Sequence, residues 1–357
     1  MPAPLELTGD AVVLLRALID IESVSGNEAQ IADAVEAALR PYGHLQVIRE
    51  GNLILARTDL GRAERVIIAG HLDTVPIANN LPSRVTDDGA RTLIWGRGAC
   101  DMKGGVAAQR SAAARLVRPS RDLTWIFYDN EEVEEDLNGL NRLAREHPDQ
   151  LRGDFAVLCE PTNARIEGGC QGTMRVMVEL TGTAAHSARS WMGHNAIHDA
   201  AAALQRLAAY QAEQVTVDGL TYREGLNAVR ISGGIAGNVI PDRCDIEVNY
   251  RFAPDKSAEQ AEARVREVLA GFPVRVTDVA PGARPGLDQP VAAAFLASVG
   301  GGASAKFGWT DVARFSAMGI PAVNFGPGDP SKAHADDEFC PADEVLACRD
   351  ALVRWLS

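Results

Sequence analysis

The chain has 357 residues, of which 46% are hydrophobic and 23% are charged, and its formal net charge is −13. This length exceeds the usual size of a single hydrophobic core, so two domains are expected. The negative charge argues against nucleic acid or an anionic membrane as a partner, and no apolar run approaches the length needed to span a bilayer.

Residues 1–10 lack the basic stretch and the apolar core of a secretory signal. The six cysteines form no CxxC pair and have no framework spacing, so reduced thiols are expected. Together these features predict a cytoplasmic protein.

The first part of the chain alternates between helical and strand-like segments. Val12, Leu15 and Leu18 recur at helical spacing, and Ser25 with Glu28 forms a candidate capping box for a second helix that runs to residue 38. Short continuous apolar runs are typical of strands buried on both faces of a helix-flanked sheet, and they occur at 53–56, 66–69, 125–128 and 155–158. Helices are expected at 105–116 and 139–145. This pattern predicts an α/β fold built on a mixed sheet.

After residue 172 the pattern changes to that of a smaller α+β sandwich. Strands are expected at 174–180, 229–235 and 244–252, and helices at 196–210 and 258–269. The Pro- and Gly-rich segment 281–286 leads back to the first domain, which resumes with helices at 291–299 and 342–356 and a strand at 321–325. We therefore predict a first domain of residues 1–173 and 285–357, with residues 174–284 inserted into it.

Metal-ligand side chains collect just past the ends of the apolar runs. They are His71 and Asp73, Glu131 and Glu132, Glu160, His334 after a later strand, and Asp101 in a glycine-rich turn that leads into a helix. Ligands of open α/β sheets bind at the carboxyl ends of the strands. A lone histidine after a strand is usually a polar loop residue, so the prediction of a site depends on the joint occurrence of these residues.

The types of side chain in this set suit a two-metal site. Imidazole and carboxylate ligands without thiolates favour zinc or cobalt at a catalytic site. Of two adjacent glutamates, one can bind metal while its neighbour takes a proton from water. Asp73 can orient the ring of His71 from behind.

Four strings, in their order along the chain, resemble the M20 family of metallopeptidases and deacylases. They are Gly-His-Leu-Asp-Thr-Val-Pro at 70–76, Gly-Ala-Cys-Asp-Met-Lys-Gly-Gly at 98–105, Asn-Glu-Glu at 130–132 and Cys-Glu-Pro-Thr at 159–162. The resemblance extends from the first helices to the C-terminus. Further stretches, at 184–191, 225–229, 237–241, 307–315 and 324–329, are most similar to the actinobacterial branch that removes a succinyl group from diaminopimelate.

The resemblance implies a metal ligand set. His71 and Glu160 would hold one zinc ion, Glu132 and His334 would hold a second, and Asp101 would bridge the two. Each subunit would thus bind two zinc ions, with cobalt as the alternative metal.

The resemblance also implies the catalytic and substrate-binding residues. Glu131 would be the general base, and His186 of the inserted dimerisation or lid domain would reach the partner subunit's site and stabilise the oxyanion. A homodimer made through the inserted domain is therefore expected. Candidates for binding the carboxylates of a small anionic substrate are Arg189, Asn238, Arg251, Thr310 and Arg314.

Some positions depart from the family pattern. Cys100 stands where a small or hydroxyl residue is more common, and we expect its thiol to pack rather than to bind metal. The string Trp-Thr-Asp at 309–311 replaces the commoner Gly-Thr-Ser-Asp. The acidic run 336–338 has no explanation in the sequence.

The reaction that the resemblance implies is hydrolysis of N-succinyl-LL-2,6-diaminopimelate to succinate and LL-2,6-diaminopimelate, a step of lysine and diaminopimelate biosynthesis. Two alternatives within the family are another N-acyl amino acid deacylase, similar to acetylornithine deacetylase, and a metallopeptidase. A non-catalytic binding protein on the same scaffold would not need the full ligand set, and a nucleotide-dependent ligase would need a phosphate-binding loop.

Overall fold

The computed structural model describes residues 5, 7 and 9–357. The chain divides into two compact units. Unit 1 comprises Met1–Gly168, Pro285–Ser304 and Arg314–Ser357, and unit 2 comprises Gly169–Arg284 and Ala305–Ala313. Of the N-terminal segment predicted to lack a secretory signal, residues 1–4, 6 and 8 lie outside the described residues.

The units differ from the predicted domains at residues 169–173, which begin unit 2, and in the segment Ala305–Ala313, which also belongs to unit 2. Its side chains and backbone bond to that unit: Trp309 Nε1 donates to the Pro281 carbonyl at 3.1 Å, and Cys170 Sγ donates to the Thr310 carbonyl at 3.7 Å. Sequence periodicity carries no signal for such a return of the chain, because these contacts join residues far apart in the sequence.

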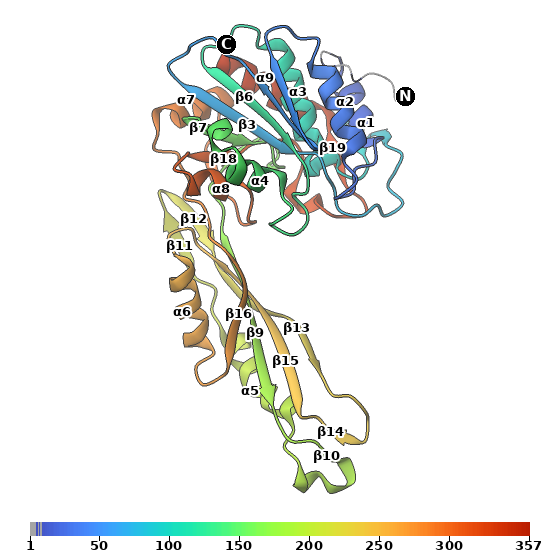
Figure 1. Ribbon diagram of the computed structural model, residues 1–357, viewed down its shortest axis with the longest axis vertical. Helices are drawn as coiled ribbons and strands as arrows, with labels where there is room; N and C mark the ends of the chain where they lie inside the picture. The colour runs from blue at the N-terminus through green and yellow to red at the C-terminus, as the bar shows by residue number, and fades with distance from the viewer. Residues whose placement is uncertain (1–4, 6, 8) are drawn as a thin grey trace. The chain divides into compact units, whose positions relative to one another are not determined.

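Unit 1 contains an eight-stranded mixed sheet in the order β1-β2-β6-β3-β7-β18-β8-β17 (Figure 1). The strands are β1 Gln46–Glu50, β2 Leu53–Arg57, β3 Arg65–His71, β6 Asp122–Tyr128, β7 Phe155–Leu158, β8 Ile166–Gly168, β17 Ala303–Ala305 and β18 Ala322–Asn324. The central strands β6, β3, β7 and β18 are parallel, and β1, β2 and β8 pair antiparallel with their neighbours.

Helices cover this sheet on both faces. They are α1 Ala11–Ile19, α2 Ala29–Leu39, α3 Gly104–Arg115, α4 Gly139–Glu146, α7 Pro290–Val299 and α9 Ala342–Leu356. The short helix α8, Val312–Ala317, begins in unit 2 and ends in unit 1. Val66 and Ile68 of β3 belong to a core cluster with residues of α3 and α9, and the intervening Ile67 is buried as well. Burial of successive residues shows that both faces are covered, as the continuous apolar runs predicted.

A small three-stranded sheet in the order β19-β5-β4 joins distant parts of unit 1. Its strands are β4 Arg84–Asp87, β5 Thr92–Trp95 and β19 Phe339–Pro341. The backbone N–H of Gly96 also donates to the Glu338 carbonyl at 3.1 Å. The pairing fixes the acidic run 336–338 next to the glycine-rich turn that follows β5.

The predicted capping box at Ser25 and Glu28 is wrong. The helix α2 begins at Ala29, and its cap residue Glu28 makes no side-chain cap hydrogen bond. Ser25 Oγ instead donates to Asp73 Oδ2 at 2.7 Å. A buried carboxylate requires hydrogen-bond donors, and this long-range partner takes the hydroxyl that the local pattern assigned to the helix.

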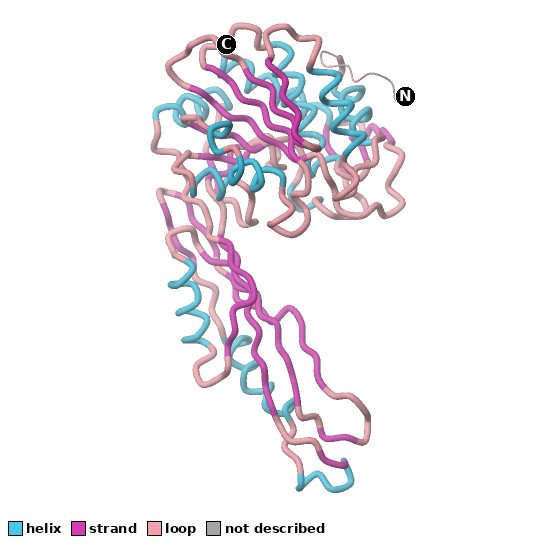
Figure 2. Tube along the Cα trace, viewed as in Figure 1, coloured by secondary structure: helices cyan, strands magenta, loops and turns pink. Residues whose placement is uncertain are grey.

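Unit 2 contains a four-stranded antiparallel sheet in the order β13-β15-β9-β16, with two helices on one face (Figure 2). Its elements are β9 Gly172–Thr181, β10 Ala185–His186, η3 Ser187–Met192, α5 Ala196–Ala209, β11 Gln214–Val217, β12 Leu220–Arg223, β13 Gly225–Gly233, β14 Val239–Ile240, β15 Arg243–Phe252, α6 Ala258–Val268 and β16 Val274–Ala280. Alternate residues of β9 and β15 form one core with α5 and α6. The α+β prediction for this region agrees with this architecture.

The fourth strand of that sheet, β16, has no counterpart among the predicted elements. Its pairing with β9 shifts register between Val276 and Asp278. A bulge of this kind breaks the alternation of buried and exposed residues by which a half-buried strand is recognised.

Within the described residues, no helix has both the length and the apolar character that crossing a membrane requires.

Candidate metal centre and active site

The loops that leave the parallel strands of unit 1 meet at one edge of the sheet. The last residue of β3, His71, pairs with the last residue of β6, Tyr128. Strand β7 lies parallel to β3 on its other side, and β18 lies parallel to β7. The loops after these four strands carry the two glutamates at 131 and 132, Glu160 and His334, so the topology brings these side chains together.

The turn η1, Ala99–Lys103, adds Asp101 to this edge. Gly98 before it has a left-handed φ of 78°, and a Cβ atom there would lie 2.6 Å from Thr74 Cγ2. A Cβ on Gly105, at the start of α3, would lie 2.0 Å from the Cys159 carbonyl oxygen. Glycine is required at both positions because the turn lies directly against the loop after β3 and against the end of β7.

Asp101 lies between the two histidines. Its Oδ1 is 3.2 Å from His71 Nε2, and its Oδ2 is 3.4 Å from His334 Nε2. His334 Nε2 also lies 2.9 Å from Glu132 Oε1. One carboxylate thus presents its two oxygens to two different groups of side chains, as a bridging ligand does.

Two triads of ligand-type side chains share Asp101. In the first, His71, Asp101 and Glu160 have ligand atoms within 4.8 Å of one another, and in the second Asp101, Glu132 and His334 do. His71, Glu131 and Glu132 form a further triad of the same size. Imidazole and carboxylate donors in this arrangement fit two divalent ions of the zinc or cobalt type.

Asp73 holds three of these residues in place. Its Oδ1 accepts from the backbone N–H of Glu131 at 2.9 Å, its Oδ2 accepts from that of Glu132 at 3.0 Å, and its carbonyl lies 3.0 Å from His71 Nδ1. The Nδ1 contact directs Nε2 of His71 towards Asp101. Asn130, just before the two glutamates, has a left-handed φ of 57°, a conformation that is uncommon outside glycine and is frequent at functional sites.

The carboxylates of this cluster stabilise positive charge. Burial opposes a charge on the His71 ring, but hydrogen bonds to Asp101 and Asp73 outweigh it and raise the pKa of His71 well above its usual range. Hydrogen bonds to Asp101 and Glu132 raise the pKa of His334 to about 10. Burial, and the charge of Asp101, raise the pKa of Glu132. A cluster that favours protonated imidazole rings in this way also favours a metal cation in place of the ring protons.

In unit 2 the predicted residues form two separate groups. His186, Arg189 and Asn238 share one end: the ring Nδ1 of His186 accepts from Ala188 N–H at 3.1 Å, and the Asn238 carbonyl accepts from Ser187 N–H at 2.9 Å.

The second group, Arg251 and Thr310, lies near the opposite end of β9. Arg251 pairs with Thr173 in the sheet, and Thr310 contacts Cys170. The ten residues of β9 separate the two groups by roughly 30 Å at about 3.3 Å per residue. One copy of unit 2 therefore does not bring all the predicted substrate residues together.

Arg314, the remaining predicted substrate residue, belongs to unit 1. Its Nη1 donates to Glu135 Oε1 at 2.9 Å, and its side chain is only 9% exposed. This ion pair places Arg314 beside the loop that carries Glu131 and Glu132. Glu135 itself is 60% exposed, so the ion pair lies at the edge of the solvent.

Cys100 directly precedes Asp101 in the turn. Burial, and the charges of Glu338 and Asp101, raise the pKa of the Cys100 thiol well above its usual range. The Cys100 side chain is fully buried and belongs to the hydrophobic core cluster of unit 1, as expected for a thiol that packs.

Three residues near the site were missed by the sequence reasoning. Ser25 binds Asp73, and Glu338 with Arg97 lies under the Asp101 turn. Arg97 and Glu338 are both almost fully buried, at 3% and 1% exposure. A polar residue buried away from any periodic pattern gives no local signal, although the unexplained acidic run did contain Glu338.

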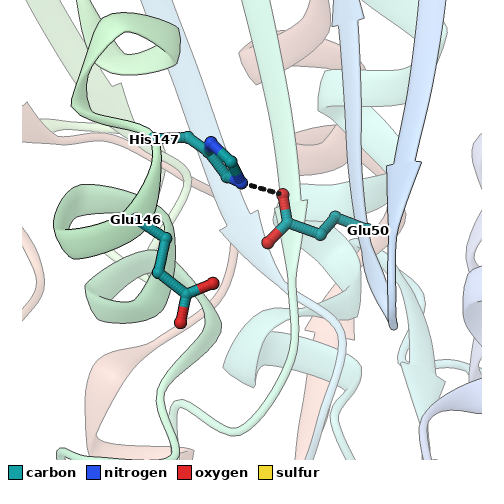
Figure 3. A group of neighbouring side chains, drawn as sticks. All are labelled: Glu50, Glu146 and His147. Atoms are coloured by element: carbon teal, nitrogen blue, oxygen red, sulfur yellow. Dashed lines mark ion pairs between the residues drawn. The ribbon is translucent and has the colours of Figure 1, made fainter.

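A second cluster of ligand-type side chains lies at the surface of unit 1 (Figure 3). Glu50 at the end of β1 and Glu146 with His147 at the end of α4 place ligand atoms within 4.8 Å of one another. His147 Nε2 is 3.5 Å from Glu50 Oε2. Glu146 and His147 are exposed and Glu50 is partly exposed, so we interpret the group as a surface ion pair of small energetic weight.

The sequence as a whole is similar to known hydrolases. Residues 67–357 match the profile of Peptidase family M20/M25/M40. A relative from Mycobacterium tuberculosis, provisionally named succinyl-diaminopimelate desuccinylase, is 55% identical over 99% of both chains. The succinyl-diaminopimelate desuccinylase of Corynebacterium glutamicum is 49% identical over 99% of this chain and 98% of its own length.

Solved structures of low identity share the fold over nearly the whole chain. A tripeptidase from Staphylococcus aureus superposes with a TM-score of 0.78 at 19% identity and covers 98% of each chain. A dinuclear metal-binding M20 peptidase from Bacillus subtilis superposes with a TM-score of 0.72 at 16% identity, covering 97% of this chain and 96% of that one.

Proposed function

The chain belongs to peptidase family M20/M25/M40, and we propose that it hydrolyses N-succinyl-LL-2,6-diaminopimelate to succinate and LL-2,6-diaminopimelate. The observation that carries the proposal is the identity of 55% and 49%, over almost the full length, to two proteins named for that reaction. The convergent carboxylates and imidazoles at the sheet edge supply the chemistry that amide hydrolysis needs. The protein is accordingly a metal-dependent hydrolase.

The metal ligands proposed are the two triads that share Asp101. His71, Asp101 and Glu160 would hold one ion, and Asp101, Glu132 and His334 would hold the other. Bound divalent ions polarise a carbonyl and lower the pKa of water. Zinc is the proposed metal, with cobalt as an alternative. The Bacillus subtilis M20 peptidase that shares the fold binds a dinuclear metal centre, which supports the proposed number of ions.

Glu131 is the proposed general base. Its carboxylate takes a proton from the water that attacks the amide carbonyl, and then gives that proton to the leaving amine nitrogen. Asp73 supports this role because it binds the backbone N–H of Glu131 and of Glu132 at once. The base and its metal-binding neighbour therefore keep a fixed relation to each other.

His186 is proposed to stabilise the oxyanion in the site of a second copy of the chain. Its side chain is exposed at one end of unit 2, about the length of β9 away from Arg251 and Thr310. A residue in this position completes a site only if that end of unit 2 meets another part of the protein. We propose that the chain forms a homodimer in which this end of unit 2 contacts the partner subunit.

The edge strand β13 supports a dimer through unit 2. One side of β13 pairs with β15, and β13 is the terminal strand in the order of the sheet. Val229 and Ile231 on it are 58% and 49% exposed, and Val229 lies at a bulge in the pairing. An uncovered edge with apolar side chains is a surface that a second copy covers by antiparallel pairing around a two-fold axis.

Binding of the substrate carboxylates is proposed for the arginines and for Thr310. Arg251 is half-buried beside Arg175, and burial and that neighbouring charge lower the pKa of Arg251. Two guanidinium groups in proximity make a local positive region in a protein of net charge −13. Arg189 and Asn238 would come from the partner together with His186, and Arg314 would act from unit 1.

The cytoplasm is the proposed compartment. All six cysteines are buried free thiols, which a reducing environment preserves.

The decisive test is a substrate panel on metal-reconstituted enzyme. Release of succinate from N-succinyl-LL-2,6-diaminopimelate should exceed hydrolysis of N-acetylornithine and of dipeptides by orders of magnitude in kcat/KM. A wide preference for acetylornithine or a dipeptide would replace the substrate while leaving a metal-dependent amidohydrolase. Lack of bound metal and of hydrolysis on every substrate would favour a binding protein on this scaffold.

A further inference from the structure

Glu338 is a buried carboxylate whose four hydrogen-bond contacts all lead to the turn that carries Asp101. Its Oε1 accepts from the backbone N–H groups of Cys100 at 3.0 Å and Asp101 at 3.1 Å. Its Oε2 accepts from the Gly98 N–H at 2.9 Å and from Arg97 Nη1 at 3.2 Å. The carboxylate thus bonds Asp101, which the two ligand triads share, and three residues just before it.

Arg97 extends these contacts to two other loops of the site. Its Nε donates to the Pro76 carbonyl at 3.0 Å, in the loop after Asp73, and its Nη1 donates to the Ala335 carbonyl at 3.2 Å, next to His334. The planar guanidinium holds these acceptors in a fixed geometry. The buried pair therefore joins the loops that carry Asp73, the bridging aspartate and His334.

We propose that Glu338, with Arg97, is a positioning pair that sets the orientation of the Asp101 carboxylate and the place of His334, and so determines the affinity and coordination geometry of the metal pair. The proposal rests on the metal centre of the proposed function. Glu338 acts through the backbone of Asp101 and is not itself a ligand. Partners that orient metal ligands typically change metal affinity about 10- to 100-fold when they are removed.

A carboxylate suits position 338 because both of its oxygens can accept hydrogen bonds. Glutamate offers acceptor sites on both oxygens and no donor. Glutamine has the same shape, but its NH2 group would face an N–H donor on one side. Glu338→Gln therefore keeps the volume and leaves at least one buried donor without its acceptor, which releases the turn.

A matched control exists in unit 2. Glu224 is 2% exposed and accepts from Tyr250 OH at 2.6 Å, from Ala253 N–H at 2.8 Å and from Lys256 Nζ at 2.8 Å. It is likewise a buried carboxylate with backbone donors and a cationic partner, but it bonds no residue of the metal cluster. Glu224→Gln should cost stability for the same physical reason as Glu338→Gln.

The experiment measures metal binding without substrate. Wild type, Glu338→Gln and Glu224→Gln are titrated with zinc against a chromophoric chelator, and their cobalt forms are compared by visible absorption. Glu338→Gln should bind zinc about 10- to 100-fold more weakly and should shift the cobalt spectrum. Glu224→Gln should match wild type in both measurements, although both variants lower the melting temperature.

If Glu338→Gln does not fold, Arg97→Lys provides the same test, since lysine keeps the charge and loses the planar fork. It should weaken zinc binding and shift the cobalt spectrum in the same direction. A variant that loses thermal stability but keeps the wild-type zinc affinity and cobalt spectrum overturns the positioning role alone. Wild-type protein that binds no metal overturns the proposed metal centre and the positioning role together.

Discussion

The cluster of ligand-type side chains in unit 1 and the His186 end of unit 2 both carry residues that we assign to one reaction, but the chain holds them in different ways. His71 is 1% exposed and contacts both Asp73 and Asp101. His186 is exposed, and its ring accepts a single hydrogen bond from the N–H of Ala188. The first imidazole has one orientation imposed by its neighbours, whereas the second has few contacts to fix it.

The difference shows that preorganisation is local in this protein. Asp73 and the backbone around it determine the cluster within a single copy of unit 1, so metal binding should not depend on assembly. The residues at the His186 end acquire a fixed place only when something covers them. The predictions below test this contrast between a self-contained cluster and a dependent surface.

The largest effect is expected for Glu131→Gln. The change removes the proposed base and keeps the metal ligands, so kcat should fall about 10³- to 10⁴-fold while the metal content stays at the wild-type value. Activity assays and elemental analysis of the same preparation measure both. The control is Glu134→Gln, an exposed neighbour that should retain the wild-type rate, and a Glu131→Gln enzyme with near-normal turnover would remove the base from the mechanism.

His186→Ala should lower kcat by about 10²- to 10³-fold, as expected for loss of an oxyanion donor, without changing zinc affinity. His194→Ala, another exposed imidazole of unit 2, serves as the control. Loss of metal from His186→Ala would contradict the separation of the two regions.

Mixing two inactive variants tests whether His186 acts across subunits. In a mixed dimer of His186→Ala with Glu131→Gln, one site has an intact base and receives His186 from its partner. Random exchange should restore about one quarter of the wild-type rate, because half of the dimers are mixed and each has one complete site. No recovery, in spite of subunit exchange verified by mass spectrometry, would place His186 in its own subunit's site.

Ile231→Asp should separate the subunits, because two like charges would meet across the edge of β13. Sedimentation should show a monomer that keeps its metal but has lost activity to the level of His186→Ala, about 10²- to 10³-fold below wild type. Leu60→Asp, at an exposed apolar position of unit 1, should stay dimeric. A fully active Ile231→Asp monomer would show that unit 1 needs no partner.

Arg251→Ala should raise KM by about 10- to 100-fold and change kcat little, since a charge-assisted hydrogen bond to a substrate carboxylate is lost. Arg275→Ala, at an exposed position of strand β16 in the same sheet, is the control and should change KM less than twofold. If the two substitutions raised KM equally, the effect would come from the net charge of the protein rather than from a specific contact of Arg251 with the substrate.

The smallest effect is expected in the pH dependence. The pKa of His334 is raised to about 10 in the metal-free protein, so the protonated ring stabilises that form below about pH 6.5, and the contribution is lost as pH rises through about 10. Zinc must displace this proton, so zinc affinity should increase from pH 6 to pH 8 with release of protons. Competition with a chelator at three pH values measures the zinc affinity. A zinc affinity that does not change with pH would show that His334 binds no metal.

The convergence of the ligand-type side chains could be predicted from the sequence because these residues lie in short local strings at strand ends. His71 and Asp73 follow one apolar run, and Glu131 with Glu132 follows another. Parallel strands then place these ends at one edge whatever the details of packing. Local sequence patterns and the topology of a parallel sheet were therefore sufficient to predict that these distant residues lie close together.

The residues that support the cluster could not be predicted in this way. Ser25 has a helix-cap pattern but binds Asp73, and Glu338 bonds a turn more than 230 positions away in the sequence. Strand β16 was missed because its bulge breaks the alternation. In each case a long-range hydrogen bond or an irregular strand register determines the structure, and a periodic sequence pattern predicts neither of these.

The exposed edge of β13 has a consequence for how the protein is made. A newly synthesised chain presents this row of backbone N–H and C=O groups, flanked by Val229 and Ile231, before any second copy is available to it. Such an edge is a template for aggregation with unrelated nascent chains. Production of the protein at high expression rates should therefore yield more insoluble material than expression slowed by low temperature.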